Sequence, residues 1–153
     1  MVDIIKNIKK LGFDISNPTL PIANYSPFII SNKLIFISGQ VPFKNNVILF
    51  RGKIGKDLDL DSGIKAAELC FINTLSILNF ALDGNLNKVK RCLKLGVYVN
   101  STDNFYEQPM IADGASNLLR KIFEENGGHT RIAVSTNSLP KNASVEIDSV
   151  FEF

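Results

Sequence analysis

Residues 61–82 carry apolar side chains at helical spacing over about five turns, a pattern that predicts one long amphipathic helix. Asp61 or Ser62 is the expected N-cap, because a short polar side chain there can accept a free backbone N–H. The face expected to be buried consists of Ile64, Ala67, Phe71, Leu75, Leu78 and Leu82. A second helix is expected over residues 108–125, ended by Asn126-Gly127-Gly128, with Ala115, Leu118, Leu119 and Ile122 buried.

Short segments of strand-like composition surround the two helices: 28–30, 34–38, 47–50, 88–100, 131–137 and 143–153. The strand at 34–38 is apolar along its length, so both of its faces are expected to be buried. The segment at 88–100 alternates instead, which predicts a buried face of Leu93, Leu95, Val97 and Val99 and an outer face of Lys90, Cys92, Lys94 and Tyr98. The last two strands are expected to form a hairpin around Leu139-Pro140-Lys141.

The order of these segments predicts a single α+β domain over residues 1–153. Residues 2–11 suit a short amphipathic helix ended by Gly12, and residues 1–20 form an N-terminal helix and lead-in. No internal repeat, low-complexity tract or interdomain linker interrupts the remainder. Two long helices can cover only one face of the sheet, and the other face carries semi-apolar residues that a monomer would leave in water. We therefore expect an oligomer.

Composition narrows the function classes. Seventeen basic and fifteen acidic side chains leave a net charge of +2, so only weak, salt-dependent RNA binding is expected. Cys70 and Cys92 lie in apolar periodic segments without a CxxC pair, which indicates reduced, packed thiols, and a single histidine disfavours a zinc site. Neither a signal peptide nor a stretch of membrane-span character is apparent, so a cytoplasmic location without a membrane partner is expected.

The last two strands carry the candidate chemistry. Alternation places Arg131, Ala133 and Ser135 on one face of their strand, and Glu146, Asp148 and Glu152 opposite the apolar face of theirs. If both apolar sets face the helices, Arg131 and Glu146 share the other face, close together across a turn near Pro140. An arginine fork can bind a substrate carboxylate, and a neighbouring carboxylate can polarise a water or move a proton. The alternative is a structural ion pair between Arg131 and Glu146 or Asp148.

Three blocks of sequence resemble the YjgF/Rid (reactive intermediate deaminase) family, in its longer RidA-like subgroup. The segment 131–147, with Arg131, Leu139-Pro140 and Val145-Glu146-Ile147 at the family spacing, resembles its C-terminal signature. Pro21, Tyr25 and Ser38-Gly39-Gln40 resemble its N-terminal block, and Asp103-Phe105 resembles a third, looser block. Together these blocks span nearly the whole chain after residue 20. The family is also known as the endoribonuclease L-PSP family.

The resemblance implies a chorismate-mutase-like fold, a mixed sheet with two main helices on one face, in a homotrimer with a cleft at each subunit interface. It implies cofactor-free, metal-free hydrolysis of enamines and imines such as 2-aminoacrylate to 2-keto acids and ammonia, as in 2-iminobutanoate/2-iminopropanoate deaminases. In this interpretation Arg131 binds the substrate carboxylate and Glu146 orients the water. Backbone N–H groups of Gly39 and Ala133 meet the substrate's polar atoms, and Tyr25 lines the pocket.

Several positions leave alternatives open. Many family members carry cysteine where Ala133 stands, so no thiol chemistry is expected. The family's helix asparagine matches Asp113, Ser116 or Asn117. His129 is either a proton donor or a loop residue at a helix C-terminus, and Ser38 is a weaker candidate without a histidine partner. The rival functions are RNA cleavage of the endoribonuclease L-PSP type and non-catalytic binding of 2-keto acids by a trimer.

Overall fold

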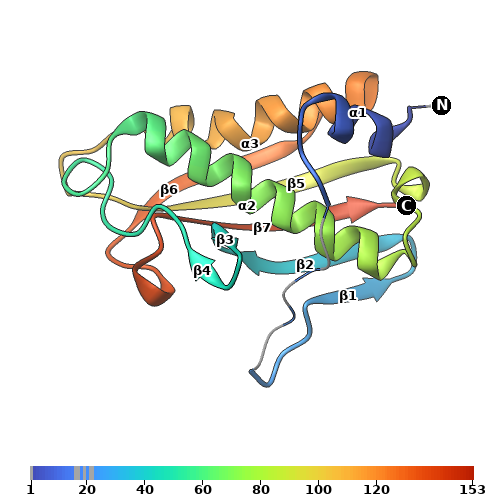
Figure 1. Cartoon of the computed structure of the whole chain (residues 1–153), viewed down its shortest axis with the longest axis horizontal. Helices are drawn as coiled ribbons and strands as arrows, with labels where there is room; N and C mark the ends of the chain where they lie inside the picture. The colour runs from blue at the N-terminus through green and yellow to red at the C-terminus, as the bar shows by residue number, and fades with distance from the viewer. Residues whose placement is uncertain (1, 16–17, 19, 21–22) are drawn as a thin grey trace.

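A five-stranded mixed sheet carries the fold, and two long helices cover one of its faces (Figure 1). The computed structural model describes residues 2–15, 18, 20 and 23–153. The sheet consists of β1 (Phe28–Ser31), β2 (Leu34–Gln40), β5 (Arg91–Asn100), β6 (Thr130–Thr136) and β7 (Val145–Glu152). Their spatial order is β1-β2-β7-β5-β6, with β5 and β6 parallel and the other pairs antiparallel. A separate ribbon pairs β3 (Phe43–Lys44) with β4 (Val47–Ile48).

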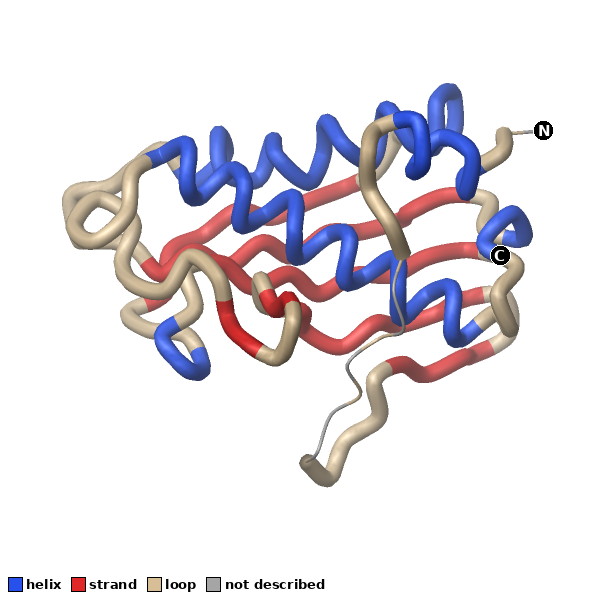
Figure 2. Tube along the Cα trace, viewed as in Figure 1, coloured by secondary structure: helices blue, strands red, loops and turns tan. Residues whose placement is uncertain are grey.

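The helices are α1 (Ile4–Lys10), α2 (Leu60–Ala81) and α3 (Gln108–Phe123), with short 3-10 turns η1 (Leu86–Lys88), η2 (Glu124–Asn126) and η3 (Pro140–Asn142) (Figure 2). The α+β class and the order of elements predicted from the sequence are confirmed. Helix α1 packs against α3 and ends before Gly12, whose φ of +80° suits a residue without a Cβ. Helix α2 begins earlier than predicted, because Asp59 is its N-cap and accepts a hydrogen bond from the Ser62 N–H at 2.8 Å.

The predicted faces of both long helices form the core. Phe71, Leu75 and Leu78 of α2 and Ala115, Leu119 and Ile122 of α3 are completely buried. By length and composition alone α2 could cross a membrane, although no span was expected from the sequence. More than half of the relevant window is buried inside the protein, where α2 contacts β2, β7 and α3. Helix α2 is therefore the central core helix of this fold.

The predicted hairpin between the last two strands is wrong. Strand β5 lies between β6 and β7, parallel to the former and antiparallel to the latter. Parallel strands need a long connection, and α3 supplies it between β5 and β6. The chain then passes over the end of β5 through η3 and enters the sheet as β7, between β2 and β5. Arg131 and Glu146 consequently lie on strands that do not touch.

Two further expectations about strand faces are wrong. In β2 only one face is buried within the chain, since Ile35 and Ile37 are covered whereas Phe36 is 44% exposed. In β5 a bulge between Cys92 and Lys94 shifts the alternation, so Cys92 points into the core and Leu93 is only half-buried. The expectation of packed, reduced thiols is confirmed, because Cys70 and Cys92 are free and buried. Burial raises the pKa of Cys92 to about 12 and that of Cys70 well above its usual range.

The sheet face opposite the helices is open in the single chain. Strand register places Ile29, Phe36, Val150, Tyr98, Val134 and Ile132 on this face. Ile29, Phe36 and Ile132 are 57%, 44% and 46% exposed. Large apolar side chains exposed on three strands of one sheet face are a feature that marks protein interfaces. We call this surface the open face.

Candidate functional site

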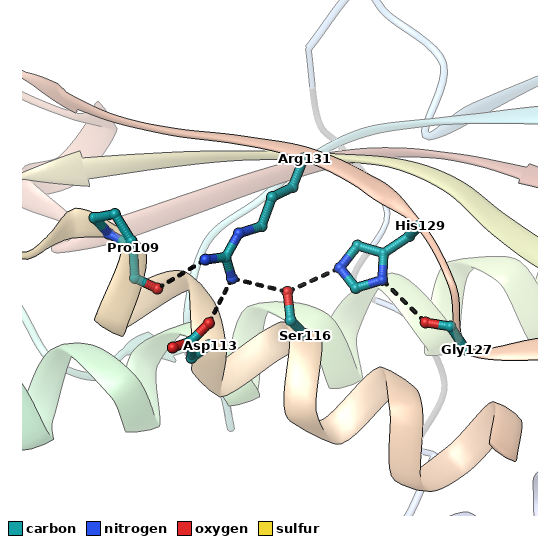
Figure 3. Close-up of polar contacts among 6 residues, drawn as sticks. All are labelled: Pro109, Asp113, Ser116, Gly127, His129 and Arg131. Atoms are coloured by element: carbon teal, nitrogen blue, oxygen red, sulfur yellow. Dashed lines mark hydrogen bonds and ion pairs between the residues drawn. The ribbon is translucent and has the colours of Figure 1, made fainter.

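Arg131 lies on the helix side of the sheet, not on the open face (Figure 3). Its Nη1 donates to Asp113 Oδ1 at 2.7 Å and to Ser116 Oγ at 3.1 Å, and its Nη2 donates to the Pro109 carbonyl oxygen at 3.3 Å. All three acceptors belong to α3. The alternation predicted for β6 is correct, but the side is reversed, because Ile132 faces outward and Ala133 packs against the core.

The contacts with α3 do not use every N–H donor of the Arg131 guanidinium. Of its five N–H groups, three bond to α3. The Nε–H and one N–H of Nη2 have no partner among the residues that the structure describes. Nε and Nη2 lie along one edge of the guanidinium plane, so they can meet both oxygens of one carboxylate. The side chain as a whole is 27% exposed, so solvent reaches part of it.

A second pair of contacts continues from Ser116 to His129 (Figure 3). The Ser116 hydroxyl lies 2.8 Å from His129 Nε2, and His129 Nδ1 lies 3.1 Å from the Gly127 carbonyl oxygen. Of the three candidates for the family asparagine, Asp113 and Ser116 thus contact Arg131, whereas Asn117 is exposed and has no hydrogen bond to it. The ion pair expected for a structural arginine exists, but its partner is Asp113 instead of Glu146 or Asp148.

Glu146 lies on the open face, opposite Tyr98 of β5 and one step from Asp148 on its own strand. Its side chain is half-buried. Burial raises the pKa of the Glu146 carboxyl above its usual value, and the neighbouring Asp148 raises it further. The charges of Asp148 and Glu146, with burial, also raise the pKa of Tyr98. The three side chains form an acidic cluster on the open face, which also carries the charged residues Arg91, Lys94 and Glu152.

Two glycines make room for this cluster. A Cβ on Gly39 would lie 2.2 Å from Glu146 Oε1, and a Cβ on Gly96 would lie 2.0 Å from Asp148 Oδ1. Gly39 also sits in a bulge, since Ile37 pairs with Ser149 and Gln40 pairs with Ile147. Two residues of β2, Ser38 and Gly39, therefore stand opposite one residue of β7, and regular pairing is interrupted there. The bare backbone of Gly39 is thus adjacent to the Glu146 carboxyl.

The remaining predicted site residues are dispersed. The Ser38 hydroxyl donates to the Ser26 carbonyl oxygen at 2.7 Å, and Tyr25 is 57% exposed in the preceding segment. Ala133 lies on the helix side with Arg131. Pro21, part of the expected N-terminal block, lies outside the described residues.

One chain does not bring the two principal groups together. In the strand register Arg131 is level with Leu95 of β5, and Leu95 is level with Ser149 of β7, three positions from Glu146. The side chains of Arg131 and Glu146 point to opposite faces of the sheet. A hollow of about 310 Å³ at the end of β6 is lined by Gln108 and Ser135 and contains neither Arg131 nor Glu146. The sequence analysis placed Asp148 on the same face as Glu146 but missed Tyr98 and Gly96 as neighbours of Glu146. The signal that could have found them is the period-two alternation of β5 and β7, which places Gly96 and Tyr98 on the face of their strand that lies level with Asp148 and Glu146.

The fold and sequence define the class of protein. Residues 7–152 match the family model described as "YjgF/chorismate_mutase-like, putative endoribonuclease". The chain belongs to this family, which confirms the resemblance found in its sequence.

Individual relatives resemble the chain over nearly its full length. Protein TCP17 of Trypanosoma cruzi is 38% identical over 97% of this chain and 93% of its own. The structure of Atu1372 from Agrobacterium tumefaciens is 45% identical, with a TM-score of 0.89 over 98% of this chain and 93% of its own. A putative endoribonuclease from Shewanella oneidensis is 27% identical, with a TM-score of 0.94 over 98% of this chain and 99% of its own.

Proposed function

We propose that this protein hydrolyses 2-imino acids to 2-keto acids and ammonia without a cofactor. The observation that carries the proposal is Glu146, a half-buried carboxyl with a raised pKa on the open face, beside the bare backbone of Gly39. A carboxyl group with a raised pKa is a stronger base when ionised, which suits a group that takes a proton from water and passes it on. Such a group suits a reaction that requires water activation and proton transfer in turn.

The chemistry needs few groups. Water adds to the C=N carbon, and the imine nitrogen takes up a proton, which gives a carbinolamine. The hydroxyl proton of this intermediate is then transferred to the amino nitrogen, the C–N bond breaks, and ammonia departs with the electron pair while the C=O bond of the keto acid forms. Glu146 accepts the proton of the attacking water and returns it to nitrogen, while the free edge of Arg131 holds the substrate carboxylate. Imines also hydrolyse without a catalyst, so the enzyme can accelerate the reaction by positioning these groups.

The opposed placement of Arg131 and Glu146 supports an assembly in which the site is shared. A small imino acid cannot contact both groups of one chain, because they lie on opposite faces of the sheet. In the proposed homotrimer, Glu146 of one chain meets Arg131 of the next in a cleft between subunits. The exposed apolar residues of the open face are the surface that such an assembly would cover.

Assembly is therefore the first expected result. Sedimentation equilibrium at micromolar concentration should give about three times the chain mass of 16.9 kDa. A charge placed on the open face by Phe36→Asp should shift the equilibrium toward monomer and reduce activity with it. The matched control is Val47→Asp, because Val47 is 53% exposed on the separate β3–β4 ribbon and not on this face. A stable wild-type monomer would contradict both the trimer and the shared cleft.

The activity itself is tested by generating a 2-imino acid with an amino acid oxidase and trapping the unhydrolysed imine with semicarbazide. Addition of this protein should reduce the trapped product and accelerate ammonia release. Binding of 2-ketobutyrate without any effect on the imine would favour the rival function, a non-catalytic 2-keto acid-binding trimer.

The endoribonuclease alternative draws on the names of the family and of the Shewanella relative. The net charge of +2 gives it little electrostatic support. Specific RNA cleavage that is lost in Arg131→Ala protein, purified in parallel, would place this activity first.

A further inference from the structure

We infer that Ser116 and His129 are positioning residues that fix the guanidinium of Arg131 for carboxylate binding. The inference rests on the proposed function for its ligand, although the contacts that carry it exist in the unliganded chain. It assigns a role to a buried serine and to the only histidine of the sequence. Neither residue contacts Glu146, so they act on the carboxylate end of the substrate and not on its reacting carbon.

The donors and acceptors form a chain with one direction. A carbonyl oxygen can only accept, so His129 Nδ1 carries the hydrogen that is donated to Gly127 at 3.1 Å. In the neutral form of the imidazole this tautomer leaves Nε2 as an acceptor, to which the Ser116 hydroxyl, 2.8 Å away, donates. With its hydrogen committed, the Ser116 oxygen accepts from Arg131 Nη1 at 3.1 Å. The orientation of the serine hydroxyl is thus set by the imidazole.

The same geometry argues against a nucleophilic serine. Ser116 is only 7% exposed within α3, and its oxygen accepts a hydrogen bond from a guanidinium. The hollow at the end of β6 is not lined by Ser116. A nucleophile must reach the substrate, whereas this hydroxyl is enclosed between a strand and a helix. The Ser116–His129 pair therefore positions Arg131 and does not act as a nucleophile and its base.

Fixing Nη1 determines where the free edge of Arg131 points. One hydrogen of Nη1 is donated to the Asp113 carboxylate, which balances its charge, and the other hydrogen is donated to the Ser116 hydroxyl oxygen. The Pro109 carbonyl oxygen accepts from Nη2, so the contacts with α3 together restrict rotation of the planar guanidinium. The Nε–H and the second Nη2 hydrogen lie on the edge opposite Nη1. A preorganised fork loses less conformational entropy when it binds a carboxylate. Loss of Ser116 or His129 should therefore weaken ligand binding without removing the charge.

The imidazole is itself anchored at the end of α3. Its Gly127 partner packs against the Arg120 backbone, where a Cβ would approach to 2.7 Å. The preceding turn is held by Asn7 of α1, whose side chain donates to the Ile122 carbonyl oxygen and to Glu124 Oε1, each at 3.0 Å. The N-terminal helix thereby supports the loop that carries His129.

The test measures 2-ketobutyrate affinity by calorimetry in single and paired variants. Ser116→Ala and His129→Phe should each raise the Kd about three- to tenfold, the loss expected for one hydrogen bond. His129→Gln retains an acceptor for the serine hydroxyl and should recover most of this loss. In an Arg131→Lys background, Ser116→Ala should leave the already weakened Kd nearly unchanged, since its target is gone. Ser76→Ala is the matched control, because Ser76 is a buried helix serine that donates to its own helix at Ile72.

Two readouts separate this inference from the function on which it rests. Thermal unfolding of the same variants reports coupling between Ser116 and Arg131 without any ligand. If wild-type protein binds 2-ketobutyrate and the Kd is indifferent to Ser116→Ala and His129→Phe, the positioning role is overturned. It is also overturned if Ser116→Ala changes the Kd by the same factor in the wild-type and Arg131→Lys backgrounds, which is the result that general destabilisation would give. If the wild type binds no keto acid, the proposed function is overturned, and thermal coupling alone then decides whether the contacts hold Arg131.

Discussion

Glu146→Gln should lower imine turnover by about 10²- to 10⁴-fold, the usual contribution of a positioned acid–base group. Glutamine preserves the shape of the side chain but can neither accept the proton of water nor return it to nitrogen. The affinity for 2-ketobutyrate should change little, because the carboxylate of the ligand is held by Arg131. Steady-state kinetics and calorimetry on one preparation give both values. Glu152→Gln is the control, since Glu152 follows on the same face of β7 but pairs with Arg91.

The same variant should be more stable than wild type at neutral pH. The pKa of Glu146 is raised in the folded protein, mainly by burial, so folding disfavours its charged form. This group therefore costs no stability below its unfolded pKa of about 4.3, and it costs stability once the pH rises through the raised folded pKa. The Tm difference between Glu146→Gln and wild type should accordingly grow from about pH 4 to pH 7. A wild-type Tm above that of the variant at pH 7 would contradict the burial of a charged Glu146.

Arg131→Ala should lower both keto-acid affinity and kcat/KM by about ten- to a hundredfold, as expected for a lost charge-assisted bond. Arg131→Lys keeps the charge but loses the planar fork, so an intermediate loss is expected. Both variants should also lose some thermal stability, because Arg131 links β6 to α3 through three hydrogen bonds.

Loss of stability alone is separated by two matched variants. Arg91→Ala removes another strand arginine, whose acidic partner at 2.7 Å is Glu152 of β7 and not a residue of α3, and it should leave affinity unchanged. Asp113→Asn retains an acceptor for Nη1 and should cost less affinity than Arg131→Ala. An Arg131→Ala protein that is destabilised yet fully active would show that the arginine is purely structural.

Much of the fold was predictable because it depends on local periodicity. Helical spacing in α2 and α3 identified the residues that are buried, and glycine and proline marked the ends of several elements. Pairing between strands was not predictable in the same way. Nothing local distinguishes a hairpin between β6 and β7 from the insertion of β7 beside β2, since the choice depends on the helix that crosses between β5 and β6. Bulges at Ser38-Gly39 and after Cys92 also leave no period-two signal.

The candidate site was predicted by residue but not by place. Arg131 and Glu146 were identified from their chemistry and spacing, yet the assumption that apolar residues face the helices fails on β6. Ile132 faces outward, and Arg131 turns toward α3 because Asp113 and Ser116 satisfy its guanidinium there. On β6 the larger apolar side chains, Ile132 and Val134, lie on the open face, so an apolar pattern alone does not tell which face of a strand packs against the helices. The structure resolves that ambiguity, and the sequence alone does not.

Subunit mixing tests the shared site most directly. Arg131→Ala and Glu146→Gln proteins, each nearly inactive, are dissociated together in denaturant and reassembled at equal concentration. If every site takes Arg131 from one chain and Glu146 from its neighbour, random trimers should regain about one quarter of wild-type imine hydrolysis. Each variant reassembled alone should stay inactive. A mixture that remains as inactive as its two components, while wild type reassembled in the same way recovers full activity, would contradict a site built between subunits.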